Sequence, residues 1–173
     1  MTKLVVIVGY TGAGKSTTAQ ALAYAHDWAY LEEDDFVFGM HPSSMRKREA
    51  SLRDCRMGML NLQSVLSNYL RKGHSVVVEG ALVDGTMLLK DFAKMAELYD
   101  CKFVPIMLVA KEAKRRMRRR INGKYVVPKR IDARLVKMAD HLKYAEQTTV
   151  IDTTNMSRKR VLAEVEKLVK AAK

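Results

Sequence analysis

The sequence is poor in cysteine and lacks long apolar runs. Its two cysteines, Cys55 and Cys101, are far apart, without a Cys-x-x-Cys pair or a histidine at metal-ligand spacing, which argues against both a disulfide and a zinc site. No apolar run approaches the roughly 18 residues of a membrane-spanning helix. The apolar start of the chain does not end in the small-residue cleavage site of a signal peptide. We therefore expect a cytoplasmic protein, or one in the host cytoplasm if the source is viral, with no membrane partner.

Acidic residues are too few to balance the basic ones. The 173 residues include 31 lysines and arginines against 19 aspartates and glutamates, a net charge of +12. Such an excess favours a polyanionic partner, because neutralised phosphates release counterions. The alternative is a basic surface with no nucleic-acid role. Proline-rich or low-complexity linkers are also lacking, so residues 1–173 are expected to form one domain.

One motif stands out against this background. Residues 9–16 read Gly-Tyr-Thr-Gly-Ala-Gly-Lys-Ser directly after the apolar run 4–8, and they fit the phosphate-binding pattern G-x-x-x-x-G-K-[ST]. In this pattern the loop N–H groups bind phosphate, Lys15 reaches the β- and γ-oxygens and the Ser16 hydroxyl ligates Mg²⁺. The motif predicts ATP and Mg²⁺ as cofactors, with nucleotide contacts from Gly9, Thr11, Gly12, Ala13, Gly14, Lys15, Ser16 and Thr17.

Five apolar stretches alternate with helical patterns. They cover residues 3–8, 28–31, 75–78, 103–109 and 148–151, and the alternation predicts βαβ units with a parallel sheet. The expected fold class is therefore α/β, a three-layer P-loop NTPase sandwich with a five-stranded parallel sheet. Pro105 lies inside the fourth stretch and lacks a ladder donor, so the regular strand is expected to start after it or to pass a bulge.

Helical periodicity fills the segments between these stretches. Apolar residues recur every three or four positions from Leu52 to Tyr69, which predicts a long amphipathic helix. We assign residues 36–72 to a small helical acceptor-binding insertion. Further helices are expected over 17–25, 88–99, 131–144 and 160–171, the last beginning near Ser157.

Acidic residues follow the second and third stretches. In a parallel sheet such strand ends border the ligand crevice, so Asp34 is the candidate that orients an attacking hydroxyl, with Asp35 and Phe36 as candidate acceptor-binding residues. Orientation suffices because phosphoryl transfer has a loose transition state. Glu79 ends the third stretch and is a candidate for acceptor binding or for Mg²⁺ through water. A solvated acidic turn and a plain strand-end charge are the alternatives.

The most basic window spans residues 110–130, where ten lysines and arginines face a single glutamate. Like charges four residues apart on a helix repel by roughly 0.2 to 0.5 kcal/mol per pair, so the window favours an anionic ligand. The Asn122-Gly123 turn suggests a mobile lid over residues 115–129. Its candidate catalytic arginines, which would grip phosphate oxygens, are Arg116, Arg119 and Arg120. A solvated basic helix is the alternative.

With the loop, the Asp34-Asp35 pair, the arginine lid and the late Asp152-Thr153-Thr154 in place, the sequence resembles the small P-loop kinases. That group includes bacteriophage 5′-hydroxyl polynucleotide kinases, zeta toxins and chloramphenicol phosphotransferases. The stretch from Arg115 through Val127-Pro128 to Met138, and the step Asp34-Asp35-Phe36, are most similar to the phage-like polynucleotide kinases.

The resemblance implies a transferase in which the loop binds ATP and Mg²⁺, Asp34 activates the hydroxyl and a lid arginine stabilises the transferred group. The family often has an arginine shortly after the aspartate pair, where this chain has Val37 and Phe38. Its third stretch, ending in Glu79-Gly80, looks more like nucleoside kinases. We expect phosphorylation of a nucleic-acid hydroxyl, a 5′ terminus or a hydroxymethylated base of DNA. The alternatives are a kinase for a nucleoside, nucleotide, sugar or antibiotic, and a nucleotide-dependent switch or ATPase without an acceptor.

Overall fold

One parallel sheet organises the molecule. The computed structural model describes residues 1–38, 52–80, 89–123 and 148–172, together with Lys129, Ala133, Val136 and Lys137. Adjacent strands are parallel, in the order β2-β3-β1-β4-β5, which confirms the predicted α/β sheet. The strands are β1 (Lys3–Gly9), β2 (Ala29–Glu32), β3 (Val76–Glu79), β4 (Lys102–Val109) and β5 (Thr149–Asp152).

Most strand ends differ from the predicted ones by one residue. The larger difference concerns Pro105 in β4. The strand runs straight through Pro105, which pairs in register with Val6 of β1, so the predicted late start or bulge is wrong. Pairing of β4 with β5 begins only at Ile106, opposite Thr149. At Pro105 the strand is therefore paired on one side alone, which leaves room for a residue without an N–H group.

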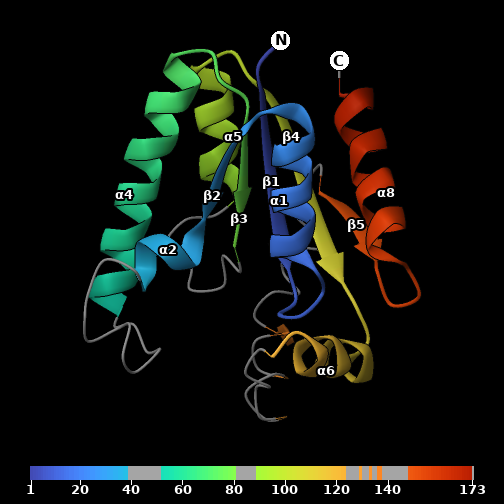
Figure 1. The fold of residues 1–173 in the computed structure, drawn as a ribbon. Coiled ribbons are helices and arrows are strands. Elements are labelled where there is room, and N and C mark those ends of the chain that lie inside the picture. Colours follow the sequence, from blue (N-terminus) through green and yellow to red (C-terminus); the bar gives the residue numbers. More distant parts are fainter. Residues whose placement is uncertain are drawn as a thin grey trace.

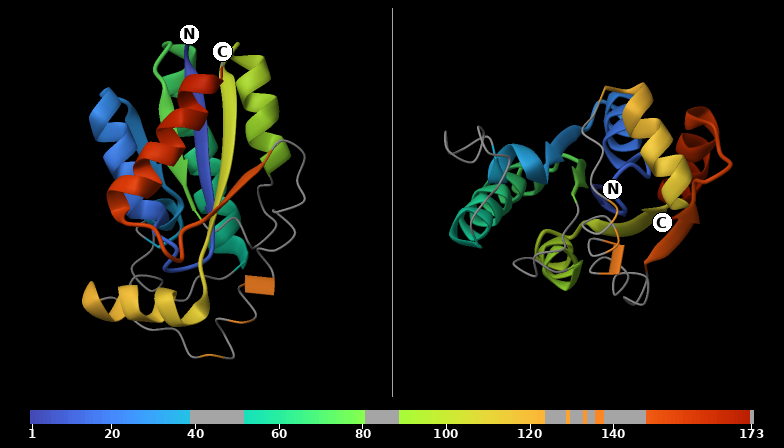
Figure 2. Two further views of the ribbon diagram at one scale, coloured as in Figure 1. Left: turned by 90° about the vertical axis from the view of Figure 1, so that its right-hand side faces the viewer. Right: turned by 90° about the horizontal axis from the view of Figure 1, so that it is seen from below.

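Helices cover both faces of the sheet (Figures 1 and 2). On one face lie α1 (Lys15–His26) and α8 (Arg158–Ala171), and on the other lie α4 (Leu52–Arg71) and α5 (Leu89–Leu98). Helix α8 begins as predicted, because the Ser157 side chain accepts a hydrogen bond from the Arg160 N–H. None of the described helices combines the length and apolarity needed to cross a membrane.

Helix α4 is part of this sandwich. Its side chains Met59, Leu62, Leu66 and Leu70 are buried in the core, whereas Tyr69, which the sequence placed on the buried stripe, is 40% exposed. One face of the predicted acceptor-binding insertion thus belongs to the central core. Residues 39–51 of that insertion, and most of the predicted helix over 131–144, lie outside the described residues.

Two more helices lie near the carboxyl ends of the strands. Helix α2 (Glu33–Val37) follows β2 directly, and α6 (Glu112–Ile121) follows β4 and lies across the end of the sheet (Figure 1). The two chain termini lie at the opposite end of the sheet. In a parallel sheet the carboxyl end is where the loops form a ligand crevice.

Candidate functional site

The loop after β1 has the conformation that its glycines allow. Gly12 (φ +83°) and Gly14 (φ +107°) have positive φ values, which side chains other than glycine rarely adopt. A Cβ atom at Gly14 would meet nothing within 4 Å, so the backbone there faces open space. Gly14 is also the N-cap of α1. The loop therefore ends at a helix N-terminus, where backbone N–H groups and the helix dipole favour an anion.

A cavity of about 510 Å³ opens in front of this loop, within the usual size range of small-ligand sites. All eight residues from Thr11 to Thr18 line it. The other lining residues come from the carboxyl ends of β2 and β3, from α2, α6 and α8, and from the loop after β5: Glu32, Asp34, Phe38, Glu79, Gly80, Arg118, Arg119, Asn122, Met156, Arg158 and Val161. Of the predicted nucleotide contacts, only Gly9 does not line the cavity.

Charges are segregated across the cavity. The carboxylates of Glu32, Asp34 and Glu79 come from the β2 and β3 side of the sheet, and the guanidinium groups of Arg118, Arg119 and Arg158 come from the β4 and β5 side. Because β1 lies between β3 and β4, its loop separates the two groups. The arrangement provides a cationic side for an anion and an acidic side for hydrogen-bond donors.

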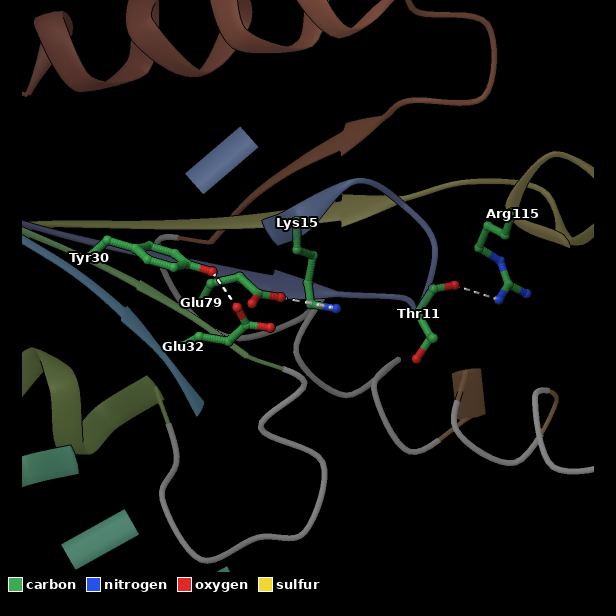
Figure 3. A network of polar contacts seen from close by, with 6 residues as sticks. All are labelled: Thr11, Lys15, Tyr30, Glu32, Glu79 and Arg115. Carbon is green, nitrogen blue, oxygen red and sulfur yellow. Dashed lines mark hydrogen bonds and ion pairs between the residues drawn. The ribbon is translucent and has the colours of Figure 1, made fainter. Parts of the chain in front are cut away.

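Lys15 forms an ion pair with Glu79 on the acidic side of the cavity (Figure 3). Its Nζ lies 3.5 Å from Glu79 Oε1, and the side chains are only 10% and 5% exposed. Burial raises the pKa of Glu79, and the Lys15 ammonium group opposes that rise. A carboxylate in this position balances the lysine charge in the absence of a bound anion.

A second carboxylate lies beside this pair. Glu32 is opposite Glu79 in the register of β2 with β3. The Tyr30 hydroxyl donates a hydrogen bond of 2.7 Å to Glu32 Oε2. Burial, this hydrogen bond and the nearby carboxylates all raise the pKa of Tyr30, so the phenol stays protonated as a donor. Neither Glu32 nor Tyr30 is among the residues predicted from the sequence; the position of Glu32 at the carboxyl end of β2 was the available signal.

The acidic turn after β2 is divided between the cavity and the surface. Both aspartates are exposed, but Asp34 lines the cavity, as predicted for the hydroxyl-orienting residue, whereas Asp35 does not. Phe36 also lies outside the cavity lining and packs against the core. Phe38 is the aromatic residue of the lining.

The three candidate lid arginines do not share one position. Arg119 lines the cavity. Arg116 is not among the lining residues, and its Nε lies 4.0 Å from Glu112 Oε1 one turn earlier in the helix. Arg120 is exposed and outside the lining. Arg120 directly follows Arg119, about 100° further around the helix, so it faces away when Arg119 faces in. Arg116 lies one turn before Arg119 and is outside the lining.

Two other arginines of α6 are attached to the phosphate loop itself. Arg115 donates to the carbonyl oxygen of Thr11 at 3.2 Å, and Arg118 donates to that of Ala13 at 3.2 Å. The part of the predicted mobile lid that precedes Gly123 is therefore tied to the loop, and residues 124–128 lie outside the described residues. Because the window contains so many arginines, the sequence alone did not show that Arg115 and Arg118 make these contacts.

The loop after β5 supports the same region. The Thr153 hydroxyl donates to the Ala13 carbonyl at 2.9 Å and accepts from Arg118. Asp152 accepts hydrogen bonds from the Thr154 hydroxyl and N–H, which lower the Asp152 pKa. The segment after β5 therefore contacts the phosphate loop at Ala13 and α6 at Arg118.

The oxygen donors present fit a magnesium ion that is shared with a nucleotide. Ser16, Asp34 and Glu79 all line the cavity, and Mg²⁺ in nucleotide sites takes one or two protein oxygens, phosphate oxygens and water. Among the described residues, no group of three or more histidines, cysteines, aspartates or glutamates could hold a metal ion by itself. The phosphates would therefore have to complete the coordination.

Comparisons with known proteins agree with this geometry. Cytidylate kinase from Dichelobacter nodosus (strain VCS1703A) is 30% identical over 98 residues, which make up 56% of this chain and 43% of that protein. The chain thus matches less than half the length of that relative. A gluconokinase from Sinorhizobium meliloti 1021 superposes with a TM-score of 0.70 at 18% identity, covering 98% of this chain and 93% of the other. A sugar kinase from Janibacter sp. HTCC2649 superposes with a TM-score of 0.72 at 16% identity, covering 99% and 96%.

Fold and site together define a P-loop protein with the architecture of the small kinases. Residues 4–126 match the sequence pattern of the family described as AAA domain, and the chain belongs to that family. The expected resemblance to small P-loop kinases is confirmed at this level. The narrower resemblance to phage polynucleotide kinases gains no support from these relatives.

Proposed function

We propose that the protein is an ATP-dependent kinase that phosphorylates a hydroxyl group of a small molecule. The observation that carries the proposal is the cavity in which a phosphate-binding loop, three carboxylates and three arginines meet. The fold of the P-loop kinases implies ATP and, typically, Mg²⁺. The similar proteins named above are kinases of gluconate, a sugar and cytidylate by their names, which favours a small acceptor.

The segregated charges favour a direction of binding. The triphosphate would lie along the loop with Arg119 and Arg158 on its flank, because arginine grips phosphate oxygens in a fork. The acceptor would then lie on the side of Glu32, Asp34 and Glu79. Carboxylates accept hydrogen bonds from hydroxyl groups and repel phosphates, so this side suits a hydroxyl-rich acceptor better than a polyanion.

In the proposed reaction the chain mainly positions groups and neutralises charge. Lys15 exchanges its contact with Glu79 for phosphate oxygens, and the loop N–H groups hold the triphosphate. Ser16 and, through water, Asp34 or Glu79 would hold Mg²⁺, which would supply charge neutralisation when bound. Asp34 orients the acceptor hydroxyl and takes its proton as the phosphoryl group moves. Arg119 stabilises the charge on the transferred group.

A polynucleotide acceptor is the competing proposal, and the net charge of +12 favours it. Exposed basic side chains do occur on the outer surface, for example Arg53 and Arg56 of α4 and Lys159 of α8. Among the described lining residues, however, the acceptor side of the cavity carries carboxylates. We therefore assign the basic excess to the surface.

The test is transfer from γ-labelled ATP with Mg²⁺ to a panel of sugars, polyols, nucleosides, nucleotides and oligonucleotides, with Lys15→Ala as the inactive control. We expect label on a small acceptor and an acceptor KM that changes little with salt. Label on oligonucleotides alone, with affinity that falls steeply with salt, would reverse the choice of acceptor. ATP hydrolysis with no labelled acceptor would contradict the kinase proposal itself.

Asp34→Asn tests the proposed role of the cavity-lining carboxylate. The amide keeps the size of the side chain but cannot take a proton, so we expect ATP affinity to stay near the wild-type value while transfer falls by about 10²-fold or more. Asp35→Asn, one residue further and outside the cavity lining, is the matched control and should keep its activity. Equal losses in the two variants would show that Asp34 has been assigned wrongly.

A further inference from the structure

The guanidinium group of Arg115 is buried, although the other described residues of this basic helix are exposed or half-buried. The residue is only 4% exposed. Its Nε donates to the Ala110 carbonyl at 3.0 Å and one terminal nitrogen donates to the Thr11 carbonyl at 3.2 Å (Figure 3). The guanidinium carbon lies 5.4 Å from the centroid of the Tyr10 ring, a cation–π contact. Burying a charge is costly unless it is hydrogen-bonded, and these contacts compensate the buried guanidinium charge.

Arg118, one turn later on α6, makes a parallel set of contacts. One terminal nitrogen donates to the Ala13 carbonyl at 3.2 Å and to the Thr153 hydroxyl at 2.9 Å, and the other donates to the Thr153 carbonyl. The Thr153 hydroxyl donates in turn to the same Ala13 carbonyl at 2.9 Å. The loop is thus held at a second carbonyl by both α6 and the segment after β5.

The orientation of each carbonyl fixes the orientation of the N–H group of the next residue. A trans peptide is planar, and its C=O and N–H bonds point in opposite directions. When the Thr11 carbonyl points toward Arg115, the N–H group of Gly12 must point away from α6. In the same way, fixing the Ala13 carbonyl directs the Gly14 N–H group. Gly12 and Gly14 have no Cβ atom and have little intrinsic preference for one peptide orientation, so an external constraint is needed.

The close packing of α6 on the loop strengthens the constraint. A Cβ atom at Gly12 would lie 3.1 Å from the Arg115 carbonyl oxygen and 3.2 Å from the Arg115 Cβ. The loop therefore touches the backbone of the helix as well as its side chains. Rotation of either peptide would break a charge-assisted hydrogen bond without a new partner in place.

We propose that Arg115 and Arg118 are positioning residues that hold the phosphate loop in its anion-binding conformation by fixing the carbonyls of Thr11 and Ala13. Arg115 does not line the cavity and acts on the loop through the Thr11 peptide plane, whereas Arg118 holds the Ala13 peptide plane and also lines the cavity. The inference rests on the proposed triphosphate site and is independent of the acceptor. It also gives part of the arginine-rich window a role that needs no nucleic acid.

The test uses Arg115→Lys and Arg118→Lys, which keep the charge but lose the planar fork that reaches two acceptors. Calorimetry measures the Kd values of ADP and AMP, because ADP adds the β-phosphate that the loop holds. We expect the preference for ADP over AMP to fall by about tenfold, the equivalent of one charge-assisted hydrogen bond. General loss of structure would weaken both nucleotides equally and leave the preference unchanged.

Lys114→Ala is the control, since it removes a positive charge from the same helix at a position outside the cavity lining. It should keep the wild-type preference. If Arg115→Lys does not fold, Arg118→Lys, whose side chain is half-buried, carries the test. A preference within about twofold of wild type in the folded variants would overturn the inference. Tight ADP binding by the wild type without any phosphorylated acceptor would contradict the proposed kinase function and leave this inference intact.

Discussion

The ion pair between Lys15 and Glu79 can be examined without any nucleotide, by measuring stability. We consider Lys15→Met, which keeps the length of the side chain and removes its charge. Glu79 then stays in place, 5% exposed, without the ammonium group that lies 3.5 Å away in the wild type. A buried carboxylate that loses its partner destabilises the fold.

The size of the effect follows from the distance and the burial. Two unit charges 3.5 Å apart attract by about 5 kcal/mol at an effective dielectric constant of about 20. Desolvation offsets part of this, and removal of one partner of a buried pair destabilises proteins by about 3 to 5 kcal/mol. Since Lys15 lines an open cavity, we expect the lower end, about 3 kcal/mol. Glu79→Gln in the same background should restore about 2 kcal/mol, because the buried charge is then gone.

The pH dependence of stability gives an independent check on the direction of the Glu79 pKa shift. Burial already raises the pKa of Glu79 in the folded wild type, and loss of Lys15 raises it further. The folded state then binds the proton more tightly than the unfolded state, so the penalty is absent below the unfolded pKa and grows as pH rises toward the folded pKa. Lys15→Met should therefore gain stability as the pH falls from 7 toward 5.

The assay is urea unfolding followed by circular dichroism for the wild type, both single variants and the double variant, at pH 7 and pH 5. The coupling between the two positions is the restored ~2 kcal/mol plus the cost of Glu79→Gln alone, so it should be at least about 2 kcal/mol at pH 7 and smaller at pH 5. Strictly additive effects at pH 7 would refute the reasoning. A Lys15→Met protein that loses stability on acidification would refute the assigned direction of the Glu79 pKa.

Two further predictions concern the backbone around the loop. A Cβ atom at Gly9 would lie 2.1 Å from the Leu108 carbonyl oxygen, whereas one at Gly14 would meet open space. Gly9→Ala should therefore lower the free energy of unfolding by at least about 3 kcal/mol and Gly14→Ala by about 1 to 2 kcal/mol; equal losses in urea melts would mean that the contact with β4 does not decide. Thr153 is fully buried and its hydroxyl bonds Ala13 and Arg118, so Thr153→Val should cost about 1 to 3 kcal/mol, whereas Thr153→Ser should melt close to the wild type. A valine variant as stable as the wild type would argue against this support of the loop.

The amino-acid sequence by itself determined the sheet and the phosphate loop. Apolar runs of β-branched residues alternate with helical periodicity, and these local patterns placed all five strands to within about a residue at most ends, a precision that follows from strand burial. The loop was equally local, because its glycines, Lys15 and Ser16 are contiguous and their spacing encodes the conformation.

Tertiary structure alone decided which charged side chains share the cavity. Arg116, Arg119 and Arg120 are the same residue type in one helix. Of these three, the direction in which α6 leaves β4 turns only Arg119 toward the cavity. The same orientation brings Arg115 and Arg118 to loop carbonyls more than 100 positions earlier in the chain. Strand order likewise put Glu79 beside Lys15. Such contacts depend on packing between distant segments, for which a local pattern carries no signal.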